Sequence, residues 1–123
     1  MTGVWLAVGI AIAGGVGAAA RHLVDSSFSP QMRARFPWGI ITINLTGSFA
    51  IGIVTGLSLA HPVAAVAATG FLGGYTTFST ASLDTVQLLM KRRYGAALVN
   101  GVGVLVAAVV LAAAGILLGR ALV

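Results

Sequence analysis

Two groups of polar residues stand inside long apolar runs of this sequence. The first is the segment GGYTTFST at residues 73–80, where two glycines and four aliphatic hydroxyls interrupt an apolar run, and the second centres on Asn44. Such residues bind ions: donors and the N-termini of half-helices favour anions, while carbonyls freed from an unwound helix coordinate cations. The sequence therefore predicts an ion path at residues 73–80. The alternative is a kink whose hydroxyls bond back to the chain's own carbonyls.

Asn44 belongs to a polar stripe on a second apolar run. Its amide offers two donors and an acceptor, Ser48 follows four residues later on the same helical face, and Thr55 lies further along. Polar groups in hydrocarbon are costly and usually mark either a site or a contact between helices. We expect Asn44 and Ser48 to face an ion path, and hydrogen bonding between helices is the alternative.

Few residues can carry charge at membrane depth. Arg21 ends a small-residue stretch, where it either extends its guanidinium to the interface or presents it at a vestibule mouth. Asp84 lies about one helical turn beyond Thr80 and is expected in a wet vestibule. His22 and His61 are 39 positions apart and cysteine is absent, so zinc, thiolate and disulfide chemistry are not expected, and neither is an enzyme.

The composition is that of a membrane protein. Of the 123 residues 59% are hydrophobic and 7% are charged, with a mean hydropathy of +1.05, whereas soluble domains carry about 25% charged residues. The net charge of +5 does not indicate nucleic-acid binding, because basic residues in so apolar a chain normally flank the spans. A water-soluble globule is excluded, and the chain is expected in the lipid bilayer.

Crossing a bilayer takes about 20 apolar residues, so residues 1–123 are predicted to form one domain of four membrane spans. The third span is expected to break within residues 73–80, where helix propensity is poor. Residues 25–37 are rich in helix breakers and are predicted as a loop, and Ala60, His61 and Pro62 as a tight turn. The four spans are residues 5–24, 38–59, 62–90 and 95–123.

Small residues recur at a spacing that lets helices approach closely. Gly52 and Gly56 form one such pair, Gly115 and Gly119 form another, and the first span has Gly9, Ala13 and Gly17. Packing within the chain and a seam between two chains fit these patterns equally well. A bundle this small encloses little, so a permeation route favours a second subunit.

Three stretches together resemble the signature of the Fluc (CrcB) fluoride channels: GGVGAAAR at residues 14–21, INLTGSF at 43–49 and GFLGGYTTFST at 70–80. The resemblance implies an all-α membrane protein that forms an antiparallel dimer of four-helix subunits, with two fluoride pores. It also implies a structural sodium ion at the dimer centre, held by the backbone carbonyls of Gly73 and Thr76. The roles it implies for side chains are donors to fluoride at Asn44, Ser79 and Thr80, a pore phenylalanine at Phe78 and a vestibule arginine at Arg21.

Passive fluoride export agrees with the chemistry of these residues. Fluoride is firmly hydrated and needs replacement donors, yet a buried fixed cation would hold it too tightly to release. A ring edge carries positive partial charge, so Phe78 can face an anion. A membrane potential negative inside drives an anion out of the cell at about 2.3 kcal/mol per 100 mV. Such a channel in the cytoplasmic (inner) membrane would lower fluoride toxicity and confer fluoride resistance.

Three features depart from the family pattern, the third of them mildly. Ala81 stands where the family usually has a second pore phenylalanine, and the fourth span lacks the family's pore hydroxyls, with Asn100 as the only polar side chain between Gly95 and Gly119. Asp84 replaces a usual glutamate. These departures bring in the alternative of a nonconducting partner subunit. A small four-helix multidrug exporter is a further alternative, although such a protein would want a carboxylate deep in a span.

Charge is distributed unevenly between the two ends of the predicted spans. One end carries six basic residues and the other carries Arg120 alone; the six are Arg21, Arg33, Arg35, Lys91, Arg92 and Arg93. By the positive-inside rule the six-residue end should face the cytoplasm. A homodimer of dual topology needs near-balanced charge, so the bias predicts an oppositely oriented homologous subunit as partner, with self-pairing as the alternative.

Overall fold

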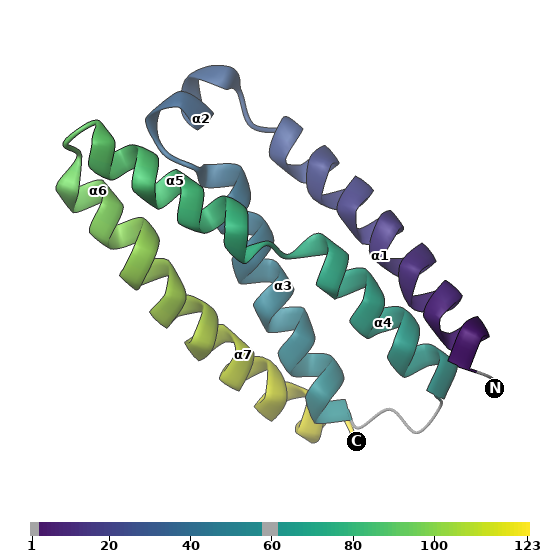
Figure 1. Cartoon of the computed structure of the whole chain (residues 1–123). Helices are drawn as coiled ribbons and strands as arrows, with labels where there is room; N and C mark the ends of the chain where they lie inside the picture. The colour runs from purple at the N-terminus through teal and green to yellow at the C-terminus, as the bar shows by residue number, and fades with distance from the viewer. Residues whose placement is uncertain (1–2, 58–61) are drawn as a thin grey trace.

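The computed structural model describes residues 3–57 and 62–123, and every regular element in these two segments is helical (Figure 1). The predicted turn at Ala60 and His61 lies outside the described residues. In chain order the elements are α1 (Gly3–Ser26), α2 (Pro30–Arg35), α3 (Trp38–Leu57), α4 (Pro62–Tyr75), α5 (Phe78–Met90), α6 (Tyr94–Leu98), the π-helix η1 (Val99–Gly103) and α7 (Val104–Ala121).

Three helical stretches of the described segments are long and apolar enough to cross a membrane. They are α1 with 24 residues, α3 with 20 and the continuous run Tyr94–Ala121 with 28. At 1.5 Å per residue, a 20-residue helix matches a hydrocarbon core about 30 Å thick. Helices α4 and α5, with 14 and 13 residues, are each too short to span alone.

The segment predicted as a loop at residues 25–37 is partly helical, so that prediction was wrong in detail. Helix α1 continues to Ser26, and α2 follows within the supposed loop. The Ser29 side chain caps α2 by accepting a hydrogen bond from the Met32 N–H at 3.2 Å, and Pro30 occupies the first turn, where no N–H is needed. The serine and proline counted as breakers are therefore helix-starting residues.

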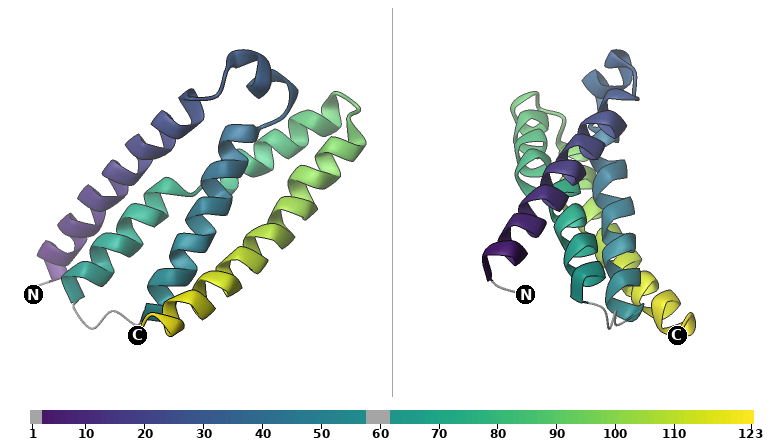
Figure 2. Two further views of the ribbon diagram at one scale, coloured as in Figure 1. Left: turned by 180° about the vertical axis from the view of Figure 1, so that it is seen from behind. Right: turned by 90° about the vertical axis from the view of Figure 1, so that its right-hand side faces the viewer.

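The helices lie in two side-by-side pairs, α1 with α4 and α3 with α7 (Figure 2). In the second pair Gly52 and Gly56 lie directly against the backbone around Gly115 and Gly119, and a Cβ at any of the four would overlap backbone atoms. In the first pair Gly17 lies against the α4 backbone in the same way. Gly17 and the four glycines of α3 and α7 thus pack within the chain, which decides between the two interpretations for these five, whereas a Cβ at Gly9 would meet nothing within 4 Å.

Most helix ends gather at the two opposite ends of the fold (Figure 1). The start of α1, the end of α7 and the start of α4 lie at the lower end in Figure 1, whereas α2 and the α5–α6 turn lie at the upper end. Among the described residues the core is thin: Ile43 is the one large side chain that is fully buried. Many large apolar side chains on α1 and α7 are exposed, as expected for surfaces that face lipid or another subunit.

Candidate ion-binding site

The Asn44 amide holds the connection between α4 and α5. Its Nδ2 donates to the Thr77 carbonyl at 2.8 Å, and its Oδ1 accepts from the Thr77 N–H at 2.9 Å. Gly47, one turn further along α3, leaves room for the Thr76 and Tyr75 side chains, and the Thr46 and Tyr75 hydroxyls lie 3.0 Å apart. Helix α3 therefore approaches the connection closely enough for one side chain to bind both polar groups of a peptide backbone.

This arrangement ends one helix and starts the next. In a continuous helix the Thr77 N–H would bond to the Gly73 carbonyl, but here it bonds to Asn44. Thr77 is extended, at φ −148° and ψ 119°, and its hydroxyl caps α5 by accepting from the Thr80 N–H at 3.2 Å. The Thr80 N–H is thereby turned away from Thr76. The carbonyls of Gly73 and Thr76 both lose the partners that a continuous helix would supply.

Thr77 is the residue at this site to which the sequence analysis gave no role. It is buried, and its hydroxyl also lies within hydrogen-bonding distance of Thr80 Oγ1 at 3.2 Å and of Ser79 Oγ at 3.5 Å. Thr76 is half-buried and bonds its hydroxyl back to the Leu72 carbonyl at 3.0 Å. The sequence left two alternatives for this segment, a hydroxyl that bonds back to its own helix and a backbone released from helical bonding. Both occur here: Thr76 has the back-bonded hydroxyl, and Thr77 has the released backbone.

An open cleft of about 270 Å³ lies beside the Asn44–Thr77 contact, between α3, α5 and the η1–α7 run. It brings together Asn44, Ser48, Thr76 and Phe78 of the predicted site with Ala81. Most of the remaining lining is apolar, and the side chains that add polar groups are Thr77, Ser82, Thr85 and Asn100. The cleft therefore offers neutral donors in an apolar surrounding, and the described residues that line it include no carboxylate or cationic group.

Asn100 is a second residue whose contribution the sequence left undefined. It lies in the π-helix η1, is only 5% exposed, and donates from Nδ2 to Thr85 Oγ1 at 2.9 Å and to the Ala81 carbonyl at 3.4 Å. Single π-helical turns are rare and often occur at functional sites. In the sequence, the one sign of a role for Asn100 is that it stands alone among apolar residues. In the structure its amide joins η1 to α5 through these hydrogen bonds.

Of the other predicted residues, Ser79, Thr80 and Gly73 are not among those that line this cleft. Phe78 lines the cleft but is 82% exposed, and Ser79 beside it is also exposed. Gly73 belongs to α4, and its α-carbon faces a separate groove formed with Ile10, Gly14, Thr69 and Gly70. The backbone interruption is therefore confined to Thr76 and Thr77, although the whole of residues 73–80 has poor helix propensity.

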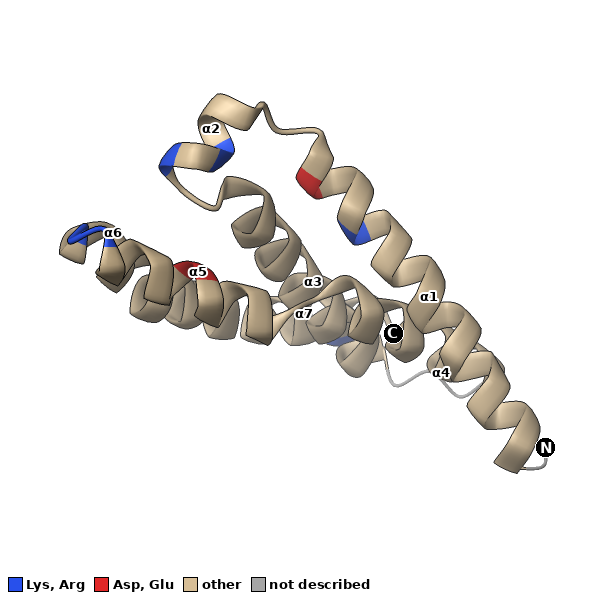
Figure 3. Cartoon of the chain, turned by 45° about the horizontal axis from the view of Figure 1, so that its top comes forward, with Lys and Arg blue, Asp and Glu red and all other residues tan. Residues whose placement is uncertain are grey.

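The two predicted vestibule residues lie away from the cleft. Arg21 is near the C-terminal end of α1 and Asp84 lies on α5; Figure 3 colours basic positions blue and acidic positions red. Asp84 lines a small polar hollow with Arg33 and Lys91. His22 is on α1, with its Nε2 at 3.5 Å from the Ser26 hydroxyl. Within the described segments, no group of three or more His, Asp or Glu side chains is placed to hold a metal ion.

Comparison with known proteins identifies the family. The family model described as CrcB-like protein, Camphor Resistance (CrcB), matches residues 8–116. This chain belongs to the CrcB family. A relative from Leifsonia xyli subsp. xyli, Fluoride-specific ion channel FluC 1, is 47% identical over 114 residues, covering 89% of this chain and 83% of the relative. Fluoride-specific ion channel FluC 2 of Mycobacterium tuberculosis is 42% identical, covering 92% and 86%.

A third relative, Fluoride-specific ion channel FluC of Nitrobacter winogradskyi, is 40% identical over 116 residues, which cover 90% of this chain and 92% of the relative. The relatives are named as channels and not as enzymes. Together with three stretches able to cross a membrane, the match identifies an integral membrane protein of ion transport. It leaves the multidrug-exporter alternative without support.

Proposed function

We propose that this chain is a subunit of a fluoride-selective ion channel that exports fluoride passively and so lowers its toxicity in the cytoplasm. The observation that carries the proposal is the family match over residues 8–116, with relatives named fluoride-specific channels at 40–47% identity. The cleft supports it, because an Asn amide, hydroxyls and a phenyl ring, without a fixed charge, suit an anion that must both enter and leave.

The proposed fluoride path uses Asn44, Ser48, Phe78, Ser79 and Thr80. One N–H of the Asn44 amide is used on Thr77, and its second N–H remains for the anion. The N-terminus of α5 begins at Phe78, and its positive end favours a negative ion there. Arg21 and Asp84 are assigned to the vestibules at the ends of the path.

The proposed sodium site uses the carbonyls of Gly73 and Thr76. Both carbonyls are released from helical bonding in the way described above, and carbonyl oxygens freed in a broken membrane helix suit a monovalent cation. Gly73 is exposed, with open space beyond its α-carbon. Two carbonyls make an incomplete shell, so the second pair has to come from a second subunit.

The assembly that follows is an antiparallel dimer in the cytoplasmic membrane, with α4 and α5 acting together as one broken span. Such a dimer would cover the open Gly73 groove and the exposed Phe78 ring. The six basic residues at the α2 end against Arg120 at the other favour a fixed orientation with the α2 end in the cytoplasm. A fixed orientation requires an oppositely oriented homologous partner.

A nonconducting partner subunit is the second candidate, favoured by Ala81 and the apolar lining that α7 contributes to the cleft. Several relatives have numbered names, such as FluC 1 and FluC 3, as expected where one organism has more than one such chain. In a heterodimer one chain can lose pore groups while the other keeps its pore.

Efflux from liposomes tests the proposal and separates the two candidates. The purified single chain should release fluoride and retain chloride if it forms a conducting homodimer, and should release neither until a homologous partner is added if it is the partner subunit. Equal release of chloride and fluoride would overturn fluoride selectivity. Reporter fusions at the C-terminus should place it on one side of the membrane, and equal signals from both sides would instead show dual topology.

A further inference from the structure

Five basic residues on two separate connections form one surface at the upper end of the molecule. Arg33 and Arg35 lie on α2, whereas Lys91, Arg92 and Arg93 form the α5–α6 turn. The Arg93 guanidinium donates to the Arg35 carbonyl, which joins the two connections directly. All five are exposed, and we call this surface the basic rim (Figure 3).

The basic rim keeps most of its charge. Within residues 3–57 and 62–123 the one ion pair joins Arg33 to Asp25, at 3.7 Å, and both side chains are partly exposed. The chain has two carboxylates in all, Asp25 and Asp84, and both lie at this end. Five cations against two carboxylates leave a net charge of about +3, and Arg93 is engaged by a neutral carbonyl.

A small hollow lies inside the rim, between α2 and α5. Arg33, Arg35 and Lys91 line it, together with Ala34, Phe36, Pro37, Asp84, Gln87 and Leu88. Cations from both connections thus converge on one polar space, as recognition of a single anionic group requires. The Asp84 carboxylate among the lining residues repels an anion, so the anion is expected on the side of Arg35 and Lys91, at the mouth of the hollow.

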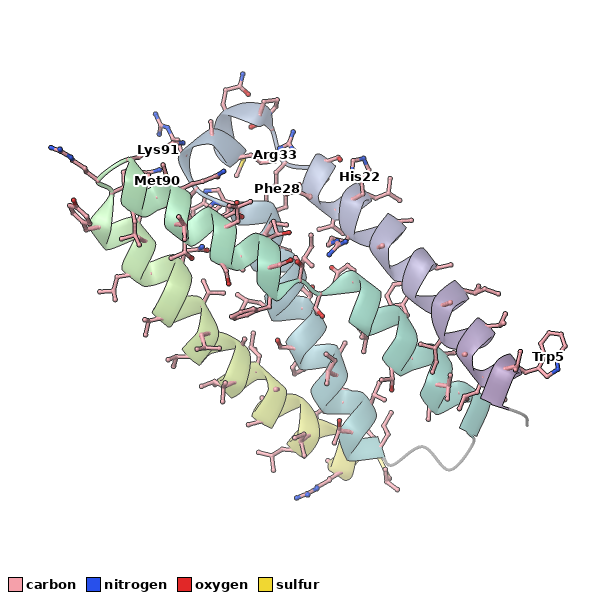
Figure 4. The ribbon with its side chains drawn as sticks, in the orientation of Figure 1. Trp5, His22, Phe28, Arg33, Met90 and Lys91 are labelled. Atoms are coloured by element: carbon pink, nitrogen blue, oxygen red, sulfur yellow. The ribbon has the colours of Figure 1, made fainter. Side chains whose placement is uncertain are left out.

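Exposed apolar side chains lie next to the rim, as expected where a protein surface meets a membrane. Met90 and Tyr94 are 78% and 62% exposed on either side of the basic turn, and Met32 on α2 is exposed as well. Figure 4 places Arg33, Lys91 and Met90 together at this end of the helices. Trp38 starts α3 and Tyr94 starts α6, the positions of aromatic residues at headgroup depth. An occupant of the rim therefore has both an anionic group and an acyl tail.

We propose that the basic rim binds the headgroup of an anionic phospholipid, with its phosphodiester at the mouth of the hollow between α2 and the α5–α6 turn. Clusters of four to eight basic residues next to a membrane span are typical of anionic-lipid recognition. A lipid phosphate bridging Arg35 and Lys91 adds to the single Arg93 contact between the two connections. It thereby steadies α5, the helix that carries Phe78.

The test measures lipid binding by the full-length protein in neutral detergent, without reference to fluoride movement. Native mass spectrometry and the melting temperature are followed as dioleoyl phosphatidylglycerol or dioleoyl phosphatidylcholine is added. The phosphatidylglycerol should bind in discrete copies and raise the melting temperature, and phosphatidylcholine should not. Each basic residue at an anionic surface is worth about fivefold in affinity, so Arg35→Gln with Lys91→Gln should weaken binding by about 25-fold.

The control is Arg120→Gln, which removes a cation at the opposite end and should leave binding unchanged. Arg35→Lys with Lys91→Arg keeps the charge and should retain most of the affinity even if the glutamine variant folds poorly. Inorganic phosphate alone should not reproduce the stabilisation. Equal binding of the two lipids, an equal loss in the Arg120 variant, or full stabilisation by inorganic phosphate would each overturn the proposal.

Discussion

Helix α3 makes two contacts of opposite character along its length. In its second half Gly52 and Gly56 pack backbone to backbone against Gly115 and Gly119 of α7, with no side chain between the helices. In its first half Asn44 reaches across to the Thr77 backbone through two hydrogen bonds. The first contact depends on shape alone and forms a closed scaffold, whereas the second depends on one amide and leaves an open cleft beside it.

The difference shows how an apolar chain satisfies the polar groups of an interrupted helix. Unsatisfied peptide groups are too costly in lipid, so each group released by the interruption at Thr76–Thr77 needs another partner. Asn44 satisfies both groups of Thr77, and the Thr77 hydroxyl satisfies the Thr80 N–H. The carbonyls that remain are those proposed for the cation.

The largest effect is expected from Asn44→Asp. The carboxylate loses the donor to the Thr77 carbonyl and puts a negative charge in the proposed anion path. Fluoride efflux from liposomes should fall by at least about 100-fold, or about 2.7 kcal/mol in barrier. Thr55→Ala, on the same helix, removes only a bond to the Ile51 carbonyl and should leave efflux unchanged. Undiminished efflux from a properly folded Asn44→Asp protein would remove Asn44 from the pore.

The scaffold contact is broken by Gly115→Ala. The added methyl group would overlap the Phe49 carbonyl on α3, and overpacking of this kind costs about 1–3 kcal/mol in the free energy of unfolding. Gly9→Ala is the matched control, because a Cβ there meets nothing within 4 Å and alanine favours a helix by up to about 1 kcal/mol. Thermal unfolding in detergent should separate the two variants in opposite directions. Equal melting temperatures would mean that α3 and α7 are not in direct backbone contact.

Asn100→Ala sharpens the comparison, since it removes a second amide that holds α5. Thr85 keeps its own bond to the Ala81 carbonyl at 2.9 Å, so the loss is partial. We expect the free energy of unfolding to fall by about 1 kcal/mol, the typical net value of one hydrogen bond, and fluoride efflux to fall by about fivefold. Thr85→Ser preserves the hydroxyl and should behave as the parent protein. A loss as large as that of Asn44→Asp would instead show that Asn100 meets the ion itself.

The sequence predicted the residues of this site better than their partners. Asn44 and the hydroxyl segment stand out because polar groups are rare in so apolar a chain, and the interruption lies within the predicted segment. The pairing of Asn44 with Thr77 joins residues 33 positions apart, and nothing local specifies it. The π-helix at Asn100 has no sequence signature either, because the two glycines among its five residues weaken an α-helix without specifying a π-turn.

The prediction of a loop at residues 25–37 failed at α2 for a different reason. Ser29 and Pro30 are a recognisable helix start, and the prediction of a loop counted both residues as breakers without weighing their order. The glycine pairs of α3 and α7 had two interpretations for a physical reason. Small residues at four-residue spacing fit any close helix, whether it belongs to the same chain or to another. Only the three-dimensional partner of Gly52 and Gly56 decides that question.

The smallest effect is expected where the open region departs most from its family. Ala81 lines the same cleft as Asn44, at the position where the resemblance implies a second phenylalanine. In Ala81→Phe the new ring edge would face the proposed path, and an aromatic contact of this kind is worth about 0.5–1 kcal/mol, or a two- to fivefold rise in efflux. Ala81→Leu adds similar bulk without a ring quadrupole, so it should not raise efflux. Fluoride efflux of the two variants, measured side by side at equal protein-to-lipid ratio, checks this. A rise in both would assign the effect to packing, and no efflux from either would favour the partner-subunit role, because a chain whose own pore is lost gains nothing from one restored ring.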